Sequence, residues 1–264
     1  SRLGTSVSGA GDLNGDGRDD LILGAPITTK LNAYAGSAYA VFGSDGLSPG
    51  RTIDLYNMGA DAIELNSNGA QSYAERVGHS VSGAGDVNGD GFNDLLIGTP
   101  NYCYLVYGAA NLSQINPLKL LFPFYNPGAG VVLTNPQGSG NFSILSYTVK
   151  VSGAGDFNRD GYDDIILGAN GEAYVIFGAP SLGSNDIFNA ANLNGSNGFR
   201  LTGMAEYRSD YTKTVASAGD LNGDGYDDLI VGSPGDSAAY VIFGTDKPFP
   251  ASLDIRNLTS LPAP

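Results

Sequence analysis

The chain has 264 residues with 39 Gly, 15 Tyr, 11 Phe and no Trp, and only 15% of its residues are charged. This mixture suits short strands joined by tight turns better than helices. Its 27 acidic residues against 13 basic ones give a net charge of −14, which argues against nucleic acid and anionic lipid as partners. The single Cys excludes an intrachain disulfide, and no apolar run reaches the roughly 20 residues that span a bilayer, so no membrane insertion is expected.

A nine-residue segment recurs four times along the chain, and similar short elements flank each copy. The copies begin at Asp12, Asp86, Asp156 and Asp220, which are 74, 70 and 64 residues apart. Each copy follows a small-residue strand and precedes a short aliphatic run. Next come aromatic strands, expected at residues 38–42, 104–107, 174–177 and 240–243. A fourth strand is expected in three copies, at residues 62–65, 130–134 and 198–202.

Four short strands per unit at this spacing predict an all-β fold, a β-propeller of four-stranded antiparallel blades. A β-sandwich is the alternative, although a sandwich does not repeat one loop four times in register. We expect a single domain over residues 1–264, with blades at approximately 3–68, 77–135, 147–204 and 214–264.

The last unit lacks a fourth strand in the sequence pattern. Two arrangements agree with this: a complete four-bladed ring whose last blade has three strands, or part of a larger propeller. An unpaired edge on the last blade invites self-assembly by strand addition, whereas prolines such as Pro248 and Pro250 would blunt that edge and keep the protein monomeric.

Every copy of the segment reads Asp-x-Asn-x-Asp-Gly-x-x-Asp, which predicts a calcium site. Ca²⁺ takes six to eight oxygen ligands, and the loop offers side-chain oxygens at positions one, three, five and nine and a carbonyl at position seven. Four ions are expected, one for each loop. Transition metals are not expected, because His and Cys, which they favour, occur once each. The predicted ligands are Asp12, Asn14, Asp16, Arg18 and Asp20; Asp86, Asn88, Asp90, Phe92 and Asp94; Asp156, Asn158, Asp160, Tyr162 and Asp164; and Asp220, Asn222, Asp224, Tyr226 and Asp228.

Asn-Gly-Asp-Gly is also good turn chemistry without any metal. Four copies that each carry all three acidic ligand positions favour the metal. The loops hold 15 of the 27 acidic residues, and four Ca²⁺ ions would bring the net charge from −14 to −6. The pattern differs from an EF-hand because position 12 is aliphatic, as at Leu23 and Ile97, and the loop joins two strands.

The small-residue strand, the acidic loop, the aliphatic strand and a Gly-Ala-Pro element together resemble the FG-GAP repeat of integrin α subunits and related surface proteins. The Gly-Ala-Pro element stands at residues 24–26, 98–100, 168–170 and 232–234. The Phe-Gly element is weaker, with Leu3-Gly4 and Val77-Gly78 in its place. The resemblance implies structural calcium sites on one face of a propeller that usually has seven blades, with partners docking on the other face or the rim.

No residue pattern indicates catalysis, so the chain is not expected to be an enzyme. His79 is the only His, and no catalytic triad can be assembled around it. Cys103 is expected to be a buried or inert thiol. The apolar stretch at residues 117–125 is interpreted as covering the flank of a blade, or as an exposed surface for a partner.

The leading hypothesis is an extracellular, secreted or cell-surface calcium-binding propeller that acts as an adhesion or protein-interaction module. Its partner would be a protein or a glycan at the cell surface. A carbohydrate-binding lectin propeller is the second hypothesis, because the 15 Tyr could stack on sugars. The third is a non-catalytic domain of a larger secreted enzyme.

Overall fold

Strands and turns account for nearly all of the secondary structure. The computed structural model describes residues 2–27, 35–55, 57–66, 76–100, 102–112, 118–119, 128–134, 149–169, 171–182, 186–205 and 213–256. The described residues include two short 3-10 helices, η2 (Ala190–Asn192) and η3 (Pro234–Asp236). None of the described helices is long and apolar enough to cross a membrane. The prediction of an all-β fold is confirmed.

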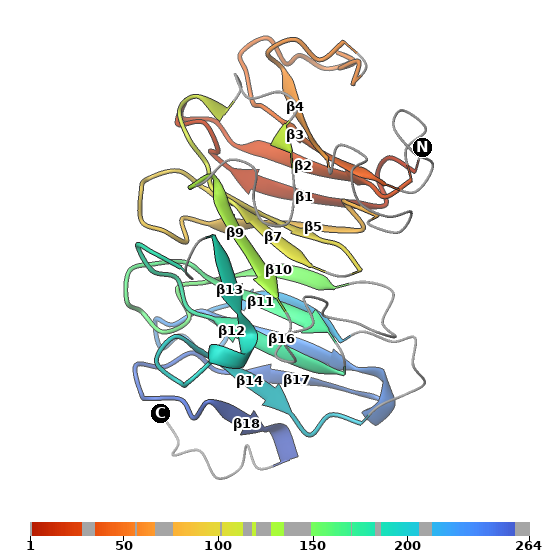
Figure 1. Cartoon of the computed structure of the whole chain (residues 1–264). Helices are drawn as coiled ribbons and strands as arrows, with labels where there is room; N and C mark the ends of the chain where they lie inside the picture. The colour runs from red at the N-terminus through yellow and green to blue at the C-terminus, as the bar shows by residue number, and fades with distance from the viewer. Residues whose placement is uncertain are drawn as a thin grey trace.

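Four antiparallel blades follow one another along the chain as a β-propeller (Figure 1). The first blade has β1 (Ser6–Gly11), β2 (Asp20–Ala25), β3 (Ser37–Val41) and β4 (Ala62–Asn66). The second has β5 (Ser80–Gly85), β6 (Asp94–Gly98), β7 (Cys103–Val106) and β9 (Gly130–Thr134). The third has β10 (Lys150–Gly155), β11 (Asp164–Ala169), β12 (Glu172–Ile176) and β14 (Gly198–Thr202). The last has β15 (Thr214–Gly219), β16 (Asp228–Ser233) and β17 (Ala238–Ile242). The strands expected from the sequence are present.

A glycine ends each inner strand where the repeated loop begins. The register between β1 and β2 shifts between Gly9 and Gly11, and Gly11 has a φ of +65°. The same shift precedes the other three loops, at Gly85, Gly155 and Gly219. A side chain would be strained at such a φ, so glycine lets the chain leave the ladder through a bulge and enter the loop.

Three blades gain a fifth strand from the blade that follows in the chain. The donated strands are β8 (Leu118–Lys119), β13 (Ile187–Asn189) and β18 (Ser252–Asp254), which pair in parallel with β4, β9 and β14. Strands β13 and β18 are labelled in Figure 1. Residues 252–254 are expected from the sequence to belong to the last blade, and their strand instead completes the third. Strand β8 lies in the apolar stretch 117–125 and covers the edge of the first blade, while the other residues of that stretch lie outside the described residues.

The hydrophobic core consists of three clusters, one between each pair of consecutive blades. Side chains alternate along a strand, so one face of a blade packs on the preceding blade and the other on the following one. In β2 and β6, for example, Ile22 and Leu95 are fully buried in the same cluster. A blade inside the series therefore has two apolar faces.

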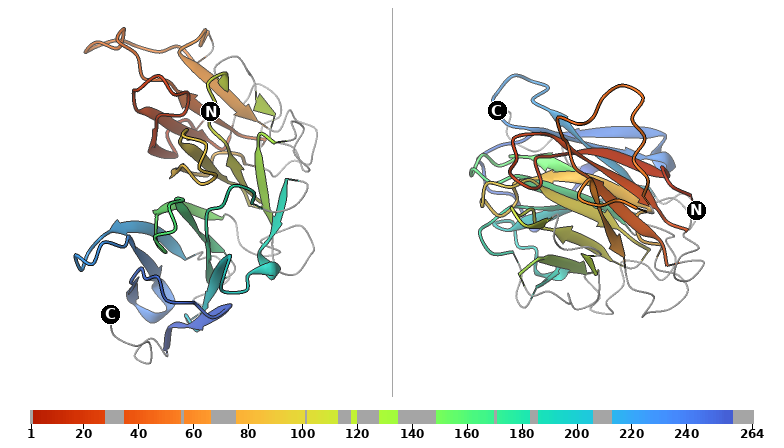
Figure 2. Two further views of the ribbon diagram at one scale, coloured as in Figure 1. Left: turned by 90° about the vertical axis from the view of Figure 1, so that its left-hand side faces the viewer. Right: turned by 90° about the horizontal axis from the view of Figure 1, so that it is seen from above.

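In the part of the chain that the structure describes, the four blades form an arc. Inner strand packs against inner strand in the order β1, β5, β10, β15. The first and the last blade lie at opposite ends of this series (Figure 2). The arrangement places the four loops that follow the inner strands in one row.

Candidate metal centre

The repeated loops lie between the inner and the second strand of each blade, and consecutive loops are in direct contact. The backbone N–H of Asn93 in the second loop donates to the carbonyl oxygen of Asp12 in the first at 3.0 Å. The N–H of Asp163 in the third loop donates to that of Asp86 at 3.2 Å. These contacts line the repeated loops up side by side along the series of blades.

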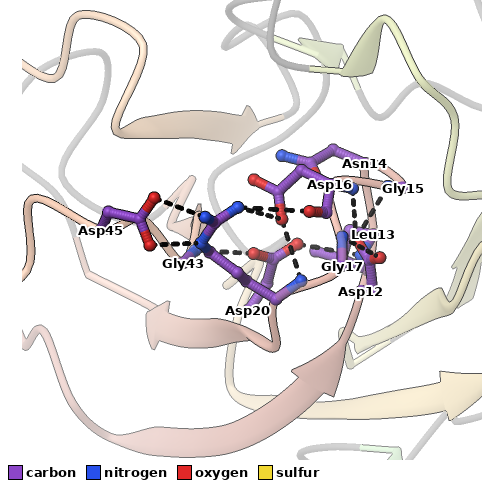
Figure 3. A network of polar contacts seen from close by, with 10 residues as sticks. Asp12, Leu13, Asn14, Gly15, Asp16, Gly17, Asp20, Gly43 and Asp45 are labelled. Atoms are coloured by element: carbon purple, nitrogen blue, oxygen red, sulfur yellow. Dashed lines mark hydrogen bonds and ion pairs between the residues drawn. The ribbon is translucent and has the colours of Figure 1, made fainter.

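The first Asp of each loop organises the turn through backbone amides. Asp12 Oδ1 accepts hydrogen bonds from the N–H groups of Gly15 and Asp16 at 2.7 and 3.1 Å, and its Oδ2 accepts one from Gly17 at 2.7 Å (Figure 3). The same position in the other loops accepts corresponding bonds, at Asp86, Asp156 and Asp220. The carboxylate thus curls the chain around itself.

The third, fifth and seventh positions continue this pattern. Asn14 Oδ1 accepts from the N–H of Asp16 at 3.0 Å, and Asp16 Oδ1 accepts from the N–H of Arg18 at 3.0 Å. Equivalent bonds from the seventh residue to the fifth recur at Phe92, Tyr162 and Tyr226. Asn88, Asn158 and Asn222 also donate from Nδ2 to the fifth-position Asp of their own loops, as Asn88 does to Asp90 at 2.9 Å.

The ninth-position Asp anchors the loop to the third strand of its blade. Asp94 is fully buried, and its two oxygens accept from the N–H groups of Val87 and Gly108, both at 2.9 Å. Burial raises the pKa of Asp94 to about 8, and the pKa of Asp164 is raised to about 8 in the same way. Asp20 and Asp228 make the equivalent pairs of bonds.

The donor set of each loop consists of oxygen atoms, the ligand type that Ca²⁺ prefers. Across the described ranges no three His, Cys, Asp or Glu side chains gather as metal ligands, and the loop oxygens accept bonds from the loop's own amides. Burial raises the pKa of Asp20, and the charges of Asp16 and Asp12 raise it further, so the carboxylates of one loop lie close enough to repel each other. A hard divalent cation would relieve that repulsion and is matched by ligands that are all oxygen.

The eighth position carries a contact that the sequence analysis missed. Asn93 Oδ1 accepts from the N–H of Asp12 at 2.8 Å, and Asp163 Oδ2 accepts from that of Asp86 at 2.7 Å. Asp227 Oδ2 likewise accepts from the N–H of Asp156 at 3.1 Å. Each of these side chains therefore binds the backbone N–H of the first residue in the repeated loop of the preceding blade. The sequence did contain a signal, because all four copies have Asp or Asn here.

The seventh side chain covers the preceding loop. A Cβ added to Gly15 would lie 2.6 Å from the ring of Phe92, and one added to Gly89 would lie 2.5 Å from the ring of Tyr162. In the third loop Arg159 replaces this glycine at a φ of +60°, and its guanidinium lies 5.4 Å from the ring centre of Tyr226. The first loop follows no described blade, and Arg18 there pairs with Asp45 at 2.6 Å.

The two other candidates for chemistry are His79 and Cys103. Burial lowers the pKa of His79, and its Nδ1 atom is buried without a hydrogen-bond partner among the described residues. Cys103 is fully buried, and burial raises the pKa of its thiol.

Comparison with known proteins places these loops in a known repeat. The family model described as "FG-GAP repeat" matches residues 3–41, 77–109, 151–184 and 214–244, and all four loops fall within these matches. Xenopus laevis integrin alpha-5 is 27% identical over 92% of this chain and 21% of its own length. Caenorhabditis elegans integrin alpha pat-2 is 28% identical over 84% of this chain and 17% of its own length.

A third relative is human integrin alpha-IIb, which is 31% identical over 66% of this chain and 15% of its own length. The chain thus spans about a fifth or less of the length of these curated relatives. Four matched repeats and relatives that align along most of the chain agree with the observed blades and loops. The chain belongs to the FG-GAP repeat family, and its fold is an integrin-α-like β-propeller.

Proposed function

We propose that this chain is an extracellular, calcium-stabilised propeller that acts as an adhesion or protein-interaction module. The observation that carries the proposal is the row of four loops with one oxygen donor set, in which a side chain of each following loop holds the loop before it. In each loop the side chains at positions one, three, five and nine and the carbonyl at position seven would hold one Ca²⁺ ion. The ions are structural in this proposal.

Electrostatics supports a structural role for calcium. Each loop concentrates three ligand carboxylates in nine residues, and the ninth-position Asp is buried. Without a cation, burial and mutual repulsion oppose ionisation of these groups. A bound Ca²⁺ would favour the ionised form of these carboxyl groups and so couple metal binding to folding.

The same residues argue against an enzyme. The acidic pairs of the described chain that could act in acid–base chemistry lie in the loops, where the ion would occupy them. His79 and Cys103 are held in inactive environments. We therefore propose a binding role, with a protein or a glycan at the cell surface as the partner.

Self-association is a further part of the proposed binding role. In the described residues the sheet of the last blade ends at β17, so the outer edge of that strand is open. An open edge is a template for strand addition from another chain. The exposed apolar surfaces of the two end blades offer a second mode of self-association.

The calcium content of the purified protein tests the structural part of the proposal. After dialysis against calcium buffer, elemental analysis should give four Ca²⁺ per chain. Asp90→Ala removes a fifth-position ligand and should lower the content to three, whereas Asp246→Ala removes an exposed carboxylate outside the loops and should leave it at four. A calcium-free protein that is folded would contradict the proposal.

Binding assays test the functional part. The calcium-loaded protein should bind immobilised cell-surface proteins, and EDTA should abolish this binding. A glycan array on the same preparation separates the protein partner from a sugar. Strong binding to defined glycans alone would identify a lectin instead.

A further inference from the structure

Exposed large apolar side chains gather at the two ends of the arc. In the part of the chain that the structure describes, Leu47 is the one such side chain that lies elsewhere. The first blade exposes Leu3, Val7 and Leu21, and the last blade exposes Leu221, Val241 and Phe243. We call these two sets the N-face and the C-face.

The N-face is the surface that inner blades bury against the blade before them. Val7 is 62% exposed and Leu21 is 51% exposed. Their equivalents in the second blade, Val81 and Leu95, are 5% and 0% exposed because the first blade covers them. The N-face is therefore the same kind of inter-blade surface, exposed in the described residues.

The C-face is the opposite half of the same kind of interface. Leu221 is 58% exposed and Phe243 is 49% exposed. Their equivalents in the first blade, Leu13 and Phe42, are 0% and 4% exposed because the second blade covers them.

The internal interface shows that the two faces fit each other. Leu13 and Phe42 belong to the same core cluster as Val81 and Leu95. The clusters between the second and third and between the third and fourth blades repeat this arrangement. The C-face of one chain therefore presents the surface that the N-face of another is shaped to cover.

Polar groups at the two ends extend the match. Inside the arc, Asp12 N–H donates to Asn93 Oδ1 at 2.8 Å, and Asn93 N–H donates back to the Asp12 carbonyl at 3.0 Å. The corresponding residues at the ends are Asp220, on the last loop, and Asp19, on the first, and both are exposed. A second copy would bring Asp19 against Asp220 in the same relation.

We propose that two copies of this chain associate head to tail, with the C-face of one copy on the N-face of the other. The proposal deepens the self-association in the proposed function and rests on the calcium-loaded fold. Because the two faces differ, the contact is heterologous, and each copy in a single contact keeps one face free. When both contacts form, the pair closes into one ring. Exposed apolar patches of this kind mark association surfaces.

Sedimentation of the calcium-loaded chain over a wide concentration range tests the association. Wild type should form dimers, or larger species if the contacts do not close. Leu21→Asp on the N-face and Phe243→Asp on the C-face each place a charge in the contact and should weaken association at least tenfold. Leu47→Asp, also at an exposed apolar residue, is the matched control and should sediment as wild type.

Mixing the two face variants tests the head-to-tail geometry. Leu21→Asp retains an intact C-face and Phe243→Asp an intact N-face, so the mixture should form a one-to-one dimer that neither variant forms alone. A strictly monomeric wild type at high concentration would overturn the proposal. So would association that persists in both variants, which would indicate strand addition at the β17 edge.

Calcium content and melting of the same samples separate the two proposals. Variants that are monomeric but still folded with four Ca²⁺ would locate the defect in the contact. A wild type that is monomeric with four Ca²⁺ bound would overturn the head-to-tail contact and leave the calcium function standing. Loss of calcium in the wild type would instead contradict the proposed function.

Discussion

The Oδ2 oxygen of Asp163 accepts a hydrogen bond from the backbone N–H of Asp86 at 2.7 Å, and this bond joins the loops of two blades. Asp86 in turn uses its own carboxylate to accept the N–H groups of Gly89, Asp90 and Gly91. The eighth residue of one loop therefore positions the residue that organises the loop before it. Loop geometry and blade packing are linked through this contact.

Removing the Asp163 carboxylate should destabilise the protein. Asp163→Ala leaves the partly buried N–H of Asp86 without its acceptor, and a hydrogen bond to a charged group contributes about 1.5–3 kcal/mol. Asp163→Asn should lower the free energy of unfolding much less, because Asn93 makes the same contact one blade earlier. Chemical unfolding in calcium buffer measures both. Asp246→Ala is the control, since Asp246 is an exposed carboxylate outside the loops, and an equal loss of stability in that variant would contradict the role of the contact.

Chelation of calcium should lower the melting temperature. Free Ca²⁺ at 100 times its dissociation constant contributes about 2.7 kcal/mol per site when the unfolded chain does not bind it. For a protein of this size 1 kcal/mol corresponds to about 2–4 °C, so even one site is measurable. EDTA should lower the transition, Ca²⁺ should restore it, and Mg²⁺ should do so much less. A melting curve that EDTA leaves unchanged would refute structural calcium.

The pH dependence of stability should change sign with calcium. In the metal-free fold the pKa of Asp94 and of Asp164 is about 8, well above the unfolded value of about 3.9. The folded state then binds more protons than the unfolded state, so metal-free stability should fall as the pH rises from 5 to about 8. With calcium bound, these carboxylates are held ionised and stability should instead be lost as the pH falls.

Unfolding at several pH values, with EDTA and with Ca²⁺, measures both slopes. Asp94→Asn removes one of the two titrating groups and should flatten the metal-free slope. Parallel slopes under the two conditions would show that the buried carboxyls do not bind the ion.

Arg159 should change the stability of the protein through two opposing effects, an unfavourable backbone conformation and a favourable contact of its side chain. The other loops have glycine at this position, and a φ of +60° costs a residue with a Cβ about 1 kcal/mol. The cation–π contact with Tyr226 offsets this by about 0.5–1 kcal/mol. Arg159→Ala should therefore be less stable than wild type, and Arg159→Gly should remain close to it. If the Gly variant were as unstable as the Ala variant, the positive φ at this position would not carry the expected cost.

The sequence predicted the blades and the loops because both depend on short-range patterns. The aliphatic and aromatic runs, such as residues 38–42, and the turn residues of the loop repeat in register, so the four copies reinforce one another. Such short-range patterns could not predict the fifth strands of the blades. β8 and β18 are two and three residues long, and their partners β4 and β14 lie in another blade, so no local pattern identifies the pairing.

The contact made by the eighth loop residue was missed for a related reason. Asp163 and Asn93 look like ordinary turn residues in the sequence. Only the packing of one blade on the next brings their oxygens to the amides of Asp86 and Asp12. Long-range geometry, rather than composition, decides what these side chains do.

Strand β18 should stabilise the third blade rather than the last. Leu253 on β18 lies opposite Leu201 on β14, is 6% exposed, and packs in the cluster between the third and fourth blades. Leu253→Ala should cost about 2–5 kcal/mol, as for other buried leucines. The carbonyl of Ala251 accepts the N–H of Arg200 at 3.0 Å, so hydrogen exchange at Arg200 should accelerate in the variant.

Leu47→Ala is the control for Leu253→Ala, because Leu47 is exposed and its truncation should change stability by less than about 0.5 kcal/mol. The strand in which amide hydrogen exchange accelerates in Leu253→Ala decides which blade β18 stabilises. If β14 loses protection while β17 keeps it, the fifth strand holds the third blade closed, as the parallel pairing of Arg200 with Ser252 requires. Faster exchange confined to β17, with Arg200 unchanged, would assign residues 252–254 to the last blade and contradict the strand exchange between blades.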